Sequence, residues 1–208
     1  MEITSRDALI VTDLQNDFCP GGALPVPDGD AVLPVIHRIA PRFRHIVLTQ
    51  DWHPPGHVSF ASSHPGSRPN DVIATAHGEQ RLWPDHCIQG TPGAEFHPSL
   101  HLPQAELILR KGYRQHIDAY SIFFENDHAT PSGFAAYCRE RGFERVFLAG
   151  LAYDFCVGFS ALDARRCGFA ATVIRDACRA IDVSGSAAAM EAAFARDGVS
   201  ILDSSAIT

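Results

Sequence analysis

Short apolar runs rich in β-branched residues alternate with helical patterns along most of this chain, and this alternation limits its fold more than any other feature. The runs span residues 8–13, 45–50, 106–111, 145–150, 171–176 and 199–203. They are almost continuously apolar, which is typical of parallel strands buried on both faces. Apolar residues at helical spacing occupy residues 30–43, 132–142, 155–168 and 184–198. This order predicts an α/β fold, with an open, mostly parallel sheet and helices on both faces in a Rossmann-like three-layer arrangement.

One long segment does not follow this pattern. Residues 51–104 are rich in Pro, Gly, His and Ser, and they hold seven of the 11 histidines. A segment of this length without periodicity, inside a compact domain, is usually a lid or a binding loop. We therefore expect a single domain over residues 1–208 with a metal-site or lid insertion at about 51–104.

The composition argues against several classes of function. The chain has 17 basic and 24 acidic residues, a net charge of −7 and no basic run, so no nucleic-acid partner is expected. No apolar run approaches the roughly 20 residues that span a bilayer, and the N-terminus lacks a signal-peptide pattern. The six cysteines include no Cys-x-x-Cys pair and are interpreted as free thiols. We expect a cytoplasmic protein without a membrane partner.

Four reactive side chains follow the predicted strands. Asp13 ends the first strand, Asp51 follows the second, Lys111 ends the third, and Cys156 lies near the start of the helix after the fourth. Ligands of open parallel sheets bind beyond the carboxyl ends of the strands, so these side chains are expected to share one rim. Lys111 is the only lysine beside 16 arginines, which indicates a position that requires a compact point charge.

Three of these residues together predict covalent acyl transfer by a thiol. An adjacent ammonium and a helix N-terminus lower the pKa of a cysteine, and a carboxylate can accept its proton. Asp13, Lys111 and Cys156 would act as base, cation and nucleophile, with backbone N–H groups of the GLAYDFC turn holding the oxyanion. Each residue also has an ordinary interpretation, as a turn aspartate, a compositional accident or a buried thiol.

A second set of candidates lies where the insertion begins. Asp51 and His53 are two positions apart on an extended segment and so point to the same side, and His86 of WPDHC is a third candidate. One aspartate and two histidines leave coordination positions open, as catalytic metal sites require. His57 is either a further ligand or a support behind the ligands. The alternative is a histidine-rich loop that binds no metal.

Five segments, which cover nearly the whole chain, resemble one known family and occur in the family's order. They are IVTDLQNDFCPGGALPV, TQDWHPPGHVSFASSH, WPDHCIQGTPGAEFHP, RKGYRQHIDAYSIFFEN and GLAYDFCV. The chain resembles the nicotinamidases, or pyrazinamidases, of the isochorismatase-like hydrolases. Isochorismatases proper lack the nucleophilic cysteine and the Asp-x-His site, and this chain has both.

The resemblance implies a role for each candidate. Asp13 is the implied general base, Lys111 the cation that stabilises the thiolate, and Cys156 the nucleophile. The implied ligands of one divalent metal ion per chain are Asp51, His53 and His86. Zinc is expected first, and iron or manganese also accept these ligands. In the family this metal holds the ring nitrogen of a pyridine and fixes the orientation of the ring.

The resemblance also implies the walls of the site. Aromatic residues that would line the ring pocket are Phe18, Trp83 and Tyr120, and such walls suit a planar heteroaromatic amide. The Leu151–Ala152 peptide is expected to be cis, with the amides of Ala152 and Cys156 forming the oxyanion hole. The chain departs from the family at Tyr153 and Phe155, since the family more often has threonine at the first of these positions.

The implied reaction is hydrolysis of nicotinamide to nicotinate and ammonia through a cysteine thioester, in NAD salvage, with pyrazinamide as a further substrate. An alternative is a related cysteine amidase that acts on another small amide or a carbamoyl compound. A third interpretation is a non-catalytic protein that senses a metal or a thiol. The sequence leaves open whether the protein is a monomer or a homo-oligomer.

Overall fold

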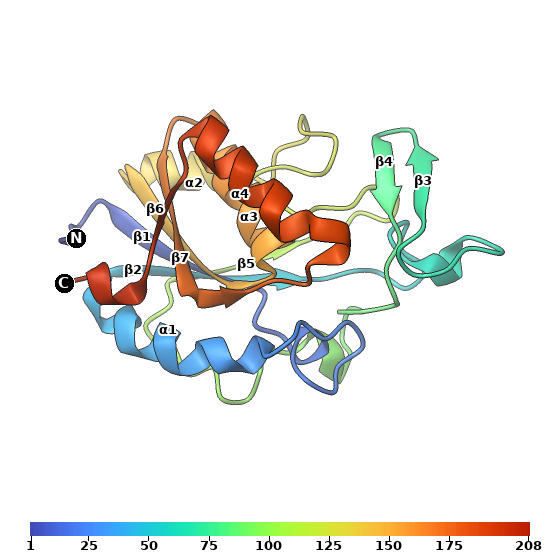
Figure 1. The fold of residues 1–208 in the computed structure, drawn as a ribbon, viewed down its shortest axis with the longest axis horizontal. Helices are drawn as coiled ribbons and strands as arrows, with labels where there is room; N and C mark the ends of the chain where they lie inside the picture. The colour runs from blue at the N-terminus through green and yellow to red at the C-terminus, as the bar shows by residue number, and fades with distance from the viewer.

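The chain folds around a six-stranded sheet, in a computed structural model that describes residues 1–208 (Figure 1). Its strands are β1 (Asp7–Thr12), β2 (His45–Asp51), β5 (Leu107–Lys111), β6 (Arg145–Leu151), β7 (Ala170–Arg179) and β8 (Ser200–Leu202). They lie in the order β5-β2-β1-β6-β7-β8, and every neighbouring pair is parallel. All six apolar runs are therefore strands of one sheet, as the sequence predicts.

Helices cover both faces of this sheet. They are α1 (Leu33–Ile39), α2 (Phe134–Glu140), α3 (Gly158–Arg166) and α4 (Ser186–Asp197). Figure 1 shows α1 on one side of the sheet and the other three helices on the opposite side, which confirms the predicted α/β architecture. None of the helices combines the length and the apolar character that a membrane crossing requires.

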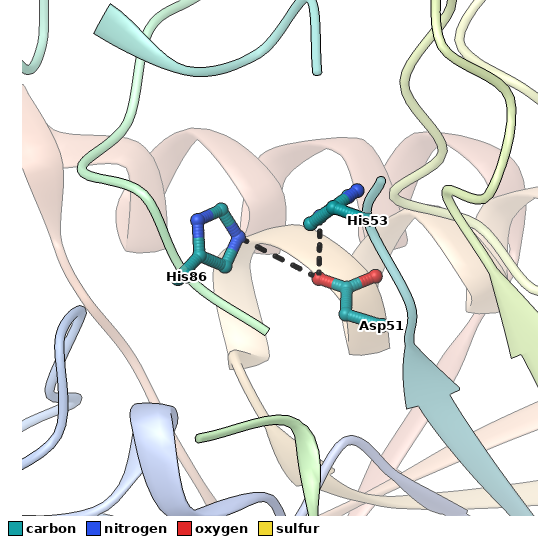
Figure 2. A group of neighbouring side chains, drawn as sticks. All are labelled: Asp51, His53 and His86. Atoms are coloured by element: carbon teal, nitrogen blue, oxygen red, sulfur yellow. Dashed lines mark ion pairs between the residues drawn. The ribbon is translucent and has the colours of Figure 1, made fainter. Parts of the chain in front are cut away.

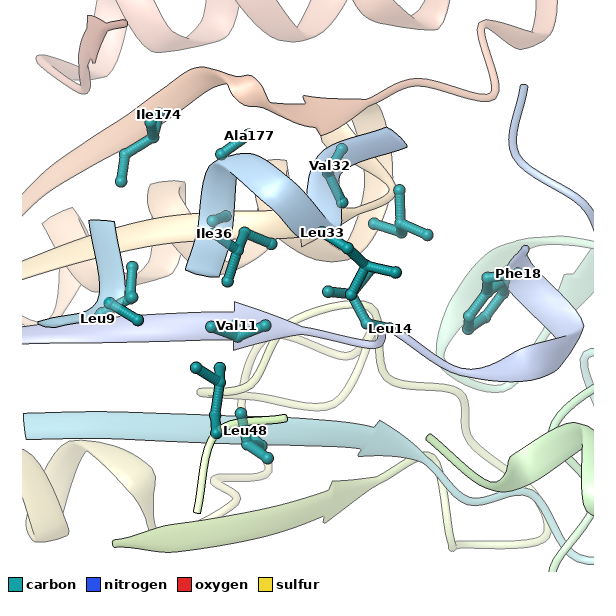
Figure 3. Close-up of a cluster of buried hydrophobic side chains, with 14 of the residues drawn as sticks. Leu9, Val11, Leu14, Phe18, Val32, Leu33, Ile36, Leu48, Ile174 and Ala177 are labelled. Atoms are coloured by element: carbon teal, nitrogen blue, oxygen red, sulfur yellow. The ribbon is translucent and has the colours of Figure 1, made fainter. Parts of the chain in front are cut away.

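The core has two halves, one on each face of the sheet. Leu9 and Val11 of β1 belong to a buried cluster that includes Ile36 of α1 (Figure 3). Ala8 and Ile10 of the same strand point the other way, into a cluster that includes side chains of α2, α3 and α4. Both faces of β1 are thus buried, which explains its continuous apolar run. This packing fixes the ends of the strands, where the reactive side chains lie.

The segment between β2 and β5 contains little regular structure. Its strands, β3 (Val72–Thr75) and β4 (Gly78–Arg81), form an antiparallel hairpin apart from the main sheet, and the sequence pattern did not predict it. Phe60 and Trp83 form an isolated bridge within the segment. Both side chains are buried, so much of the segment packs against the domain.

Candidate active site

Four of the predicted residues meet at the carboxyl ends of the strands. Asp13 follows β1, Asp51 ends β2 and Lys111 ends β5. Cys156 lies in a π-helical turn, Tyr153–Val157, which connects β6 to α3. The four strands are neighbours in the sheet, so their ends bring these residues together. All four side chains are buried.

The ammonium of Lys111 lies at the centre of this group. Its Nζ lies 2.9 Å from Oδ2 of Asp13 and 3.3 Å from Sγ of Cys156, and it also donates to Oδ1 of Asp51. Burial alone would lower the pKa of Lys111, but the carboxylates of Asp13 and Asp51 outweigh it and raise the pKa well above its usual value. Lys111 is therefore charged at neutral pH and is the counter-ion of two buried carboxylates.

The thiol of Cys156 is protonated in this arrangement. Burial raises its pKa well above the usual value, Lys111 offsets only part of this rise, and Asp13 and Asp51 add to it. The prediction from sequence, a lowered thiol pKa, was wrong because it considered the ammonium and the helix N-terminus but not the burial of the thiol or the two nearby carboxylates. A carboxylate oxygen of Asp13 lies within 4.8 Å of Sγ. A proton acceptor is thus close to a thiol that must lose its proton before it can react as a nucleophile.

The turn before Cys156 has the backbone geometry that the resemblance implied. The Leu151–Ala152 peptide bond is cis. The backbone N–H of Ala152 donates to no acceptor within the protein, and Ala152 lines the same pocket as Cys156. This leaves one backbone donor beside the thiol for a bound group.

Asp51, His53 and His86 form a compact group of possible metal ligands (Figure 2). Oδ2 of Asp51 lies 3.5 Å from Nε2 of His53 and 3.8 Å from Nε2 of His86. The three ligand atoms lie within 4.8 Å of one another, and all three side chains are buried. One carboxylate and two imidazoles are donors that zinc, iron and manganese accept.

The hydrogen bonds behind the two histidines fit a metal site. Nδ1 of His53 lies 2.8 Å from the carbonyl oxygen of Gly112, and Nδ1 of His86 lies 2.8 Å from that of Pro84. A carbonyl oxygen only accepts, so each Nδ1 carries a proton and, in the neutral ring, each Nε2 offers its lone pair toward Asp51. Gly112 has a φ of +66°, and a Cβ there would lie 2.4 Å from the His53 ring. Glycine therefore permits this close approach.

His57 lies outside this group of three. Its ring stacks on the ring of His53, with centroids 4.3 Å apart. Its Nδ1 lies 2.8 Å from the hydroxyl of Ser59, and its Nε2 lies 3.2 Å from the carbonyl oxygen of Ile117. Burial lowers the pKa of His57 to about 4. In this conformation His57 is neutral and supports His53 from behind.

An aromatic pocket connects the thiol to the three possible metal ligands. Its lining residues are Phe18, Leu24, Asp51, His53, Trp83, His86, Asp118, Tyr120, Ala152, Phe155, Cys156 and Ile181. The three aromatic residues expected from the resemblance are among them. The centroid of the Phe155 ring lies 5.0 Å from that of the Trp83 ring and 5.3 Å from that of the Tyr120 ring, and both pairs are near edge-to-face. These rings form flat apolar walls that suit a planar ring.

The two aromatic residues at which the chain departs from the family lie in different places. Phe155 lines the pocket. Tyr153 instead packs edge-to-face on Phe194 of α4, with centroids 5.7 Å apart, and its hydroxyl donates to Glu191 at 3.3 Å. Of these two residues, only Phe155 therefore contributes to the pocket.

Two buried polar residues of this region were not predicted. Asp118 lines the pocket, and its carboxylate lies within 4.8 Å of ring nitrogens of His53 and His57. Gln15 holds the backbone of Asp51: its Nε2 donates to the Asp51 carbonyl and its Oε1 accepts from the Asp51 N–H, both at 2.8 Å. Asp118 lies two residues before Tyr120, and that spacing was its only signal. No sequence signal indicated the role of Gln15, because that role depends on contacts with the end of β2, which is distant in sequence.

Comparisons with known proteins identify the family of this chain. The model of the isochorismatase domain matches residues 7–204. The chain belongs to the isochorismatase family. A nicotinamidase of Acinetobacter baylyi (strain ATCC 33305 / BD413 / ADP1) is a family relative that is 50% identical over 186 residues, which cover 89% of this chain and 87% of that protein.

Two solved structures extend the likeness within the isochorismatase family. The nicotinamidase/pyrazinamidase of Acinetobacter baumanii has a TM-score of 0.97 and 48% identity, over 98% of this chain and 99% of that one. The pyrazinamidase of Pyrococcus horikoshii in complex with zinc has a TM-score of 0.75 and 36% identity, over 95% of this chain and 99% of that one. The likeness thus includes nearly all of each chain, and with it the strand ends that carry the site.

Proposed function

We propose that this member of the isochorismatase family is a nicotinamidase, which hydrolyses nicotinamide to nicotinate and ammonia. The observation that carries the proposal is the position of Lys111, whose ammonium contacts Asp13 and Asp51 and lies 3.3 Å from Sγ of Cys156. The proposal is also supported by the aromatic pocket, which is lined by Cys156 and by the possible metal ligands Asp51, His53 and His86. The 50% identity to the Acinetobacter baylyi nicotinamidase supports the choice of substrate.

Formation of the acyl-enzyme begins with the thiol proton. Asp13 takes the proton from Sγ of Cys156 while Lys111 stabilises the thiolate, which attacks the carboxamide carbon and forms a C–S bond. The carbonyl oxygen becomes an oxyanion, and the N–H groups of Ala152 and Cys156 hold it. Asp13 then gives its proton to the amide nitrogen, the C–N bond breaks, and ammonia leaves a thioester on Cys156.

Hydrolysis of the thioester uses the same groups in reverse order. Asp13 takes a proton from a water molecule, whose oxygen attacks the thioester carbon while the backbone donors again hold the oxyanion. The C–S bond breaks, the proton on Asp13 returns to the sulfur, and the nicotinic acid that forms loses its carboxyl proton to solvent and leaves as nicotinate. The high thiol pKa in the resting site fits this scheme, because the thiol ends each cycle protonated.

We propose that Asp51, His53 and His86 hold one divalent metal ion, zinc first, with iron or manganese as the other candidates. The donor set and the Nδ1 hydrogen bonds behind both histidines support this assignment, as does the zinc complex of the Pyrococcus horikoshii relative. When bound, the metal would bind the pyridine ring nitrogen and orient the ring. Within the chain itself, Phe18, Trp83 and Tyr120 position the ring between apolar walls and exclude water.

Residues 51–104 are proposed to act as the metal-site and lid insertion of a single domain. This segment supplies His53, His86 and the pocket wall Trp83. Pyrazinamide is a planar heteroaromatic amide as well, so it is proposed as a second substrate. The cytoplasmic location expected from the sequence stays a prediction.

Ammonia release from a panel of amides tests the proposed function. Purified protein is assayed with nicotinamide, pyrazinamide and a small aliphatic carbamoyl compound, before and after chelation, with Cys156→Ala as the inactive control. Nicotinamide should be the best of the three by kcat/KM, and chelation should reduce its turnover. Preference for the aliphatic compound would support the related amidase instead, and no ammonia from any amide would refute catalysis.

A further inference from the structure

Thr49 of β2 is a buried residue that contacts the base of the proposed reaction. Its side chain is fully buried, opposite the end of β1. The backbone N–H of Asp13 donates to Oγ1 of Thr49 at 3.2 Å, and Oγ1 lies 2.5 Å from Oδ1 of Asp13. A backbone N–H only donates and a hydroxyl has one hydrogen, so the hydroxyl accepts the first bond and donates the second to Oδ1.

The two oxygens of the Asp13 carboxylate therefore differ. Oδ1 accepts the Thr49 hydroxyl. Oδ2 is buried, lies 2.9 Å from Nζ of Lys111, and has no well-formed hydrogen bond in the protein. The backbone of Asp13 has a φ of +48°, in the left-handed region that an aspartate adopts less readily than a glycine. Because Thr49 bonds to the N–H and to the carboxylate of this one residue, it holds both the unusual backbone and the side-chain rotation.

We infer that Thr49 is a positioning residue that holds Oδ1 of Asp13 and leaves Oδ2 as the oxygen that exchanges protons with substrate and thiol. In the proposed reaction the S–H bond of Cys156 breaks as an O–H bond forms on Oδ2. That O–H bond then breaks as an N–H bond forms on the departing amide nitrogen. The inference rests on the proposed function, and it adds a role for a residue that begins the family-like segment TQDWHPPGHVSFASSH but to which the resemblance assigned none.

Loss of the hydroxyl should affect the chemical step more than substrate binding. Thr49 does not line the pocket, so KM has no direct dependence on it. Without the hydroxyl, Oδ1 is free to compete with Oδ2 for the Lys111 ammonium, and the carboxylate can rotate away from the thiol. General base catalysis contributes about 10²–10⁴-fold, and a misplacement of about 1 Å can remove about 10²-fold. A reduction in kcat of about 30–100-fold is expected on that basis.

The test compares Thr49→Val with Thr49→Ser in the full-length, metal-loaded protein. Valine replaces the hydroxyl with a methyl group of similar size, whereas serine keeps the hydroxyl. Thr49→Val should lower kcat for nicotinamide by about 30–100-fold with KM within about threefold, and Thr49→Ser should recover most of kcat. If circular dichroism shows that Thr49→Val does not fold, Thr49→Ala, which also lacks the hydroxyl and has a smaller side chain, takes its place.

A second measurement separates this inference from the proposed function. The rate at which iodoacetamide alkylates Cys156 at neutral pH, followed by peptide mass spectrometry, reports proton removal from the thiol without hydrolysis of nicotinamide. Thr49→Val should slow alkylation about tenfold or more and Thr49→Ser should not. If the wild type releases no ammonia from nicotinamide, the proposed function fails while alkylation still tests Thr49. Alkylation and kcat in Thr49→Val within threefold of the wild type, or an equal loss in Thr49→Ser, would overturn the inference.

Discussion

Replacement of Lys111 by arginine should nearly abolish turnover although it keeps the charge. The ammonium is buried between two carboxylates and the thiol. A guanidinium is larger and planar, can bind one carboxylate through two N–H groups, and would draw Asp13 away from Cys156. We expect kcat/KM for nicotinamide to fall about 100-fold or more, which corresponds to about 3 kcal/mol of transition-state stabilisation.

Replacement of Lys111 by alanine should be worse, because it removes the cation entirely. Loss of one partner from a buried ion pair costs about 3–5 kcal/mol of stability. Burial raises the pKa of both Asp13 and Cys156, and the ammonium of Lys111 offsets part of each rise. Without it both values rise, so the base tends to stay protonated and the thiolate forms only at higher pH. Iodoacetamide alkylation of Cys156, measured against pH, should therefore shift to higher pH in Lys111→Ala.

The neighbouring residue in β5 provides a matched control for both variants of Lys111. Arg110 is exposed, and its guanidinium lies 3.6 Å from the centroid of the Trp52 ring. Arg110→Lys exchanges the same two residue types in the same strand, away from the thiol, and should leave kcat/KM within about threefold of the wild type. Wild-type turnover in Lys111→Arg would refute the reasoning, since the lone lysine would then be a compositional accident.

Three further perturbations have distinct expected outcomes. Cys156→Ala should abolish ammonia release. Cys167→Ser should retain it, because the Cys167 thiol is partly buried and lies outside the pocket. An electrophilic nicotinamide analogue should form a single adduct with the wild type, on Cys156, as detected by mass spectrometry. Elemental analysis should find little metal bound to Asp51→Ala. His57→Ala should lose less metal, because His57 lies behind the ligand group. Stoichiometric metal in Asp51→Ala would refute the proposed metal site. Asp7→Ala should lower the free energy of unfolding by about 2–3 kcal/mol with kcat/KM unchanged, since Asp7 is buried and binds Arg145 through both oxygens. Burial opposes ionisation of Asp7, but the hydrogen bonds from Arg145 and Thr4 lower its pKa. The contribution of Asp7 to the stability of the fold is therefore present above about pH 4 and is lost as the pH falls through the lowered pKa. Acid denaturation of the wild type and of Asp7→Ala would check this.

The sheet and the reactive residues could be predicted because each depends on a short stretch of sequence. Strands buried on both faces have to be almost continuously apolar, so ALIVTD and RVFLAG indicated β1 and β6 without knowledge of their neighbours. Parallel strands end at one edge, so residues that follow them are brought together whatever the intervening chain does. This reasoning placed Asp13, Lys111 and Cys156 on one rim, where the structure has them.

The features that were missed depend on contacts between distant segments. Thr49, Gln15 and Asp118 are polar residues without a distinctive local pattern, and their partners lie 36 residues away for the first two. The pKa of Cys156 was predicted in the wrong direction because burial depends on packing by the whole domain. The β3–β4 hairpin is short and partly exposed, and its strands, VIAT and GEQR, do not alternate apolar and polar residues in the way that would reveal them from sequence.

Asp51 belongs both to the group around the Cys156 thiol and to the group of possible metal ligands. Different contacts hold its carboxylate and its backbone. Its carboxylate accepts from Lys111, while Gln15 holds both its N–H and its carbonyl at 2.8 Å. The histidines that face Asp51 are fixed by carbonyl oxygens of Gly112 and Pro84, which do not involve the lysine. A change at Lys111 should therefore disturb the thiol and its base while the three possible metal ligands keep their backbone positions. On this reasoning the single lysine of the chain serves mainly the thiol and its base, because in the ligand group it contacts only the carboxylate of Asp51, whose backbone has supports of its own.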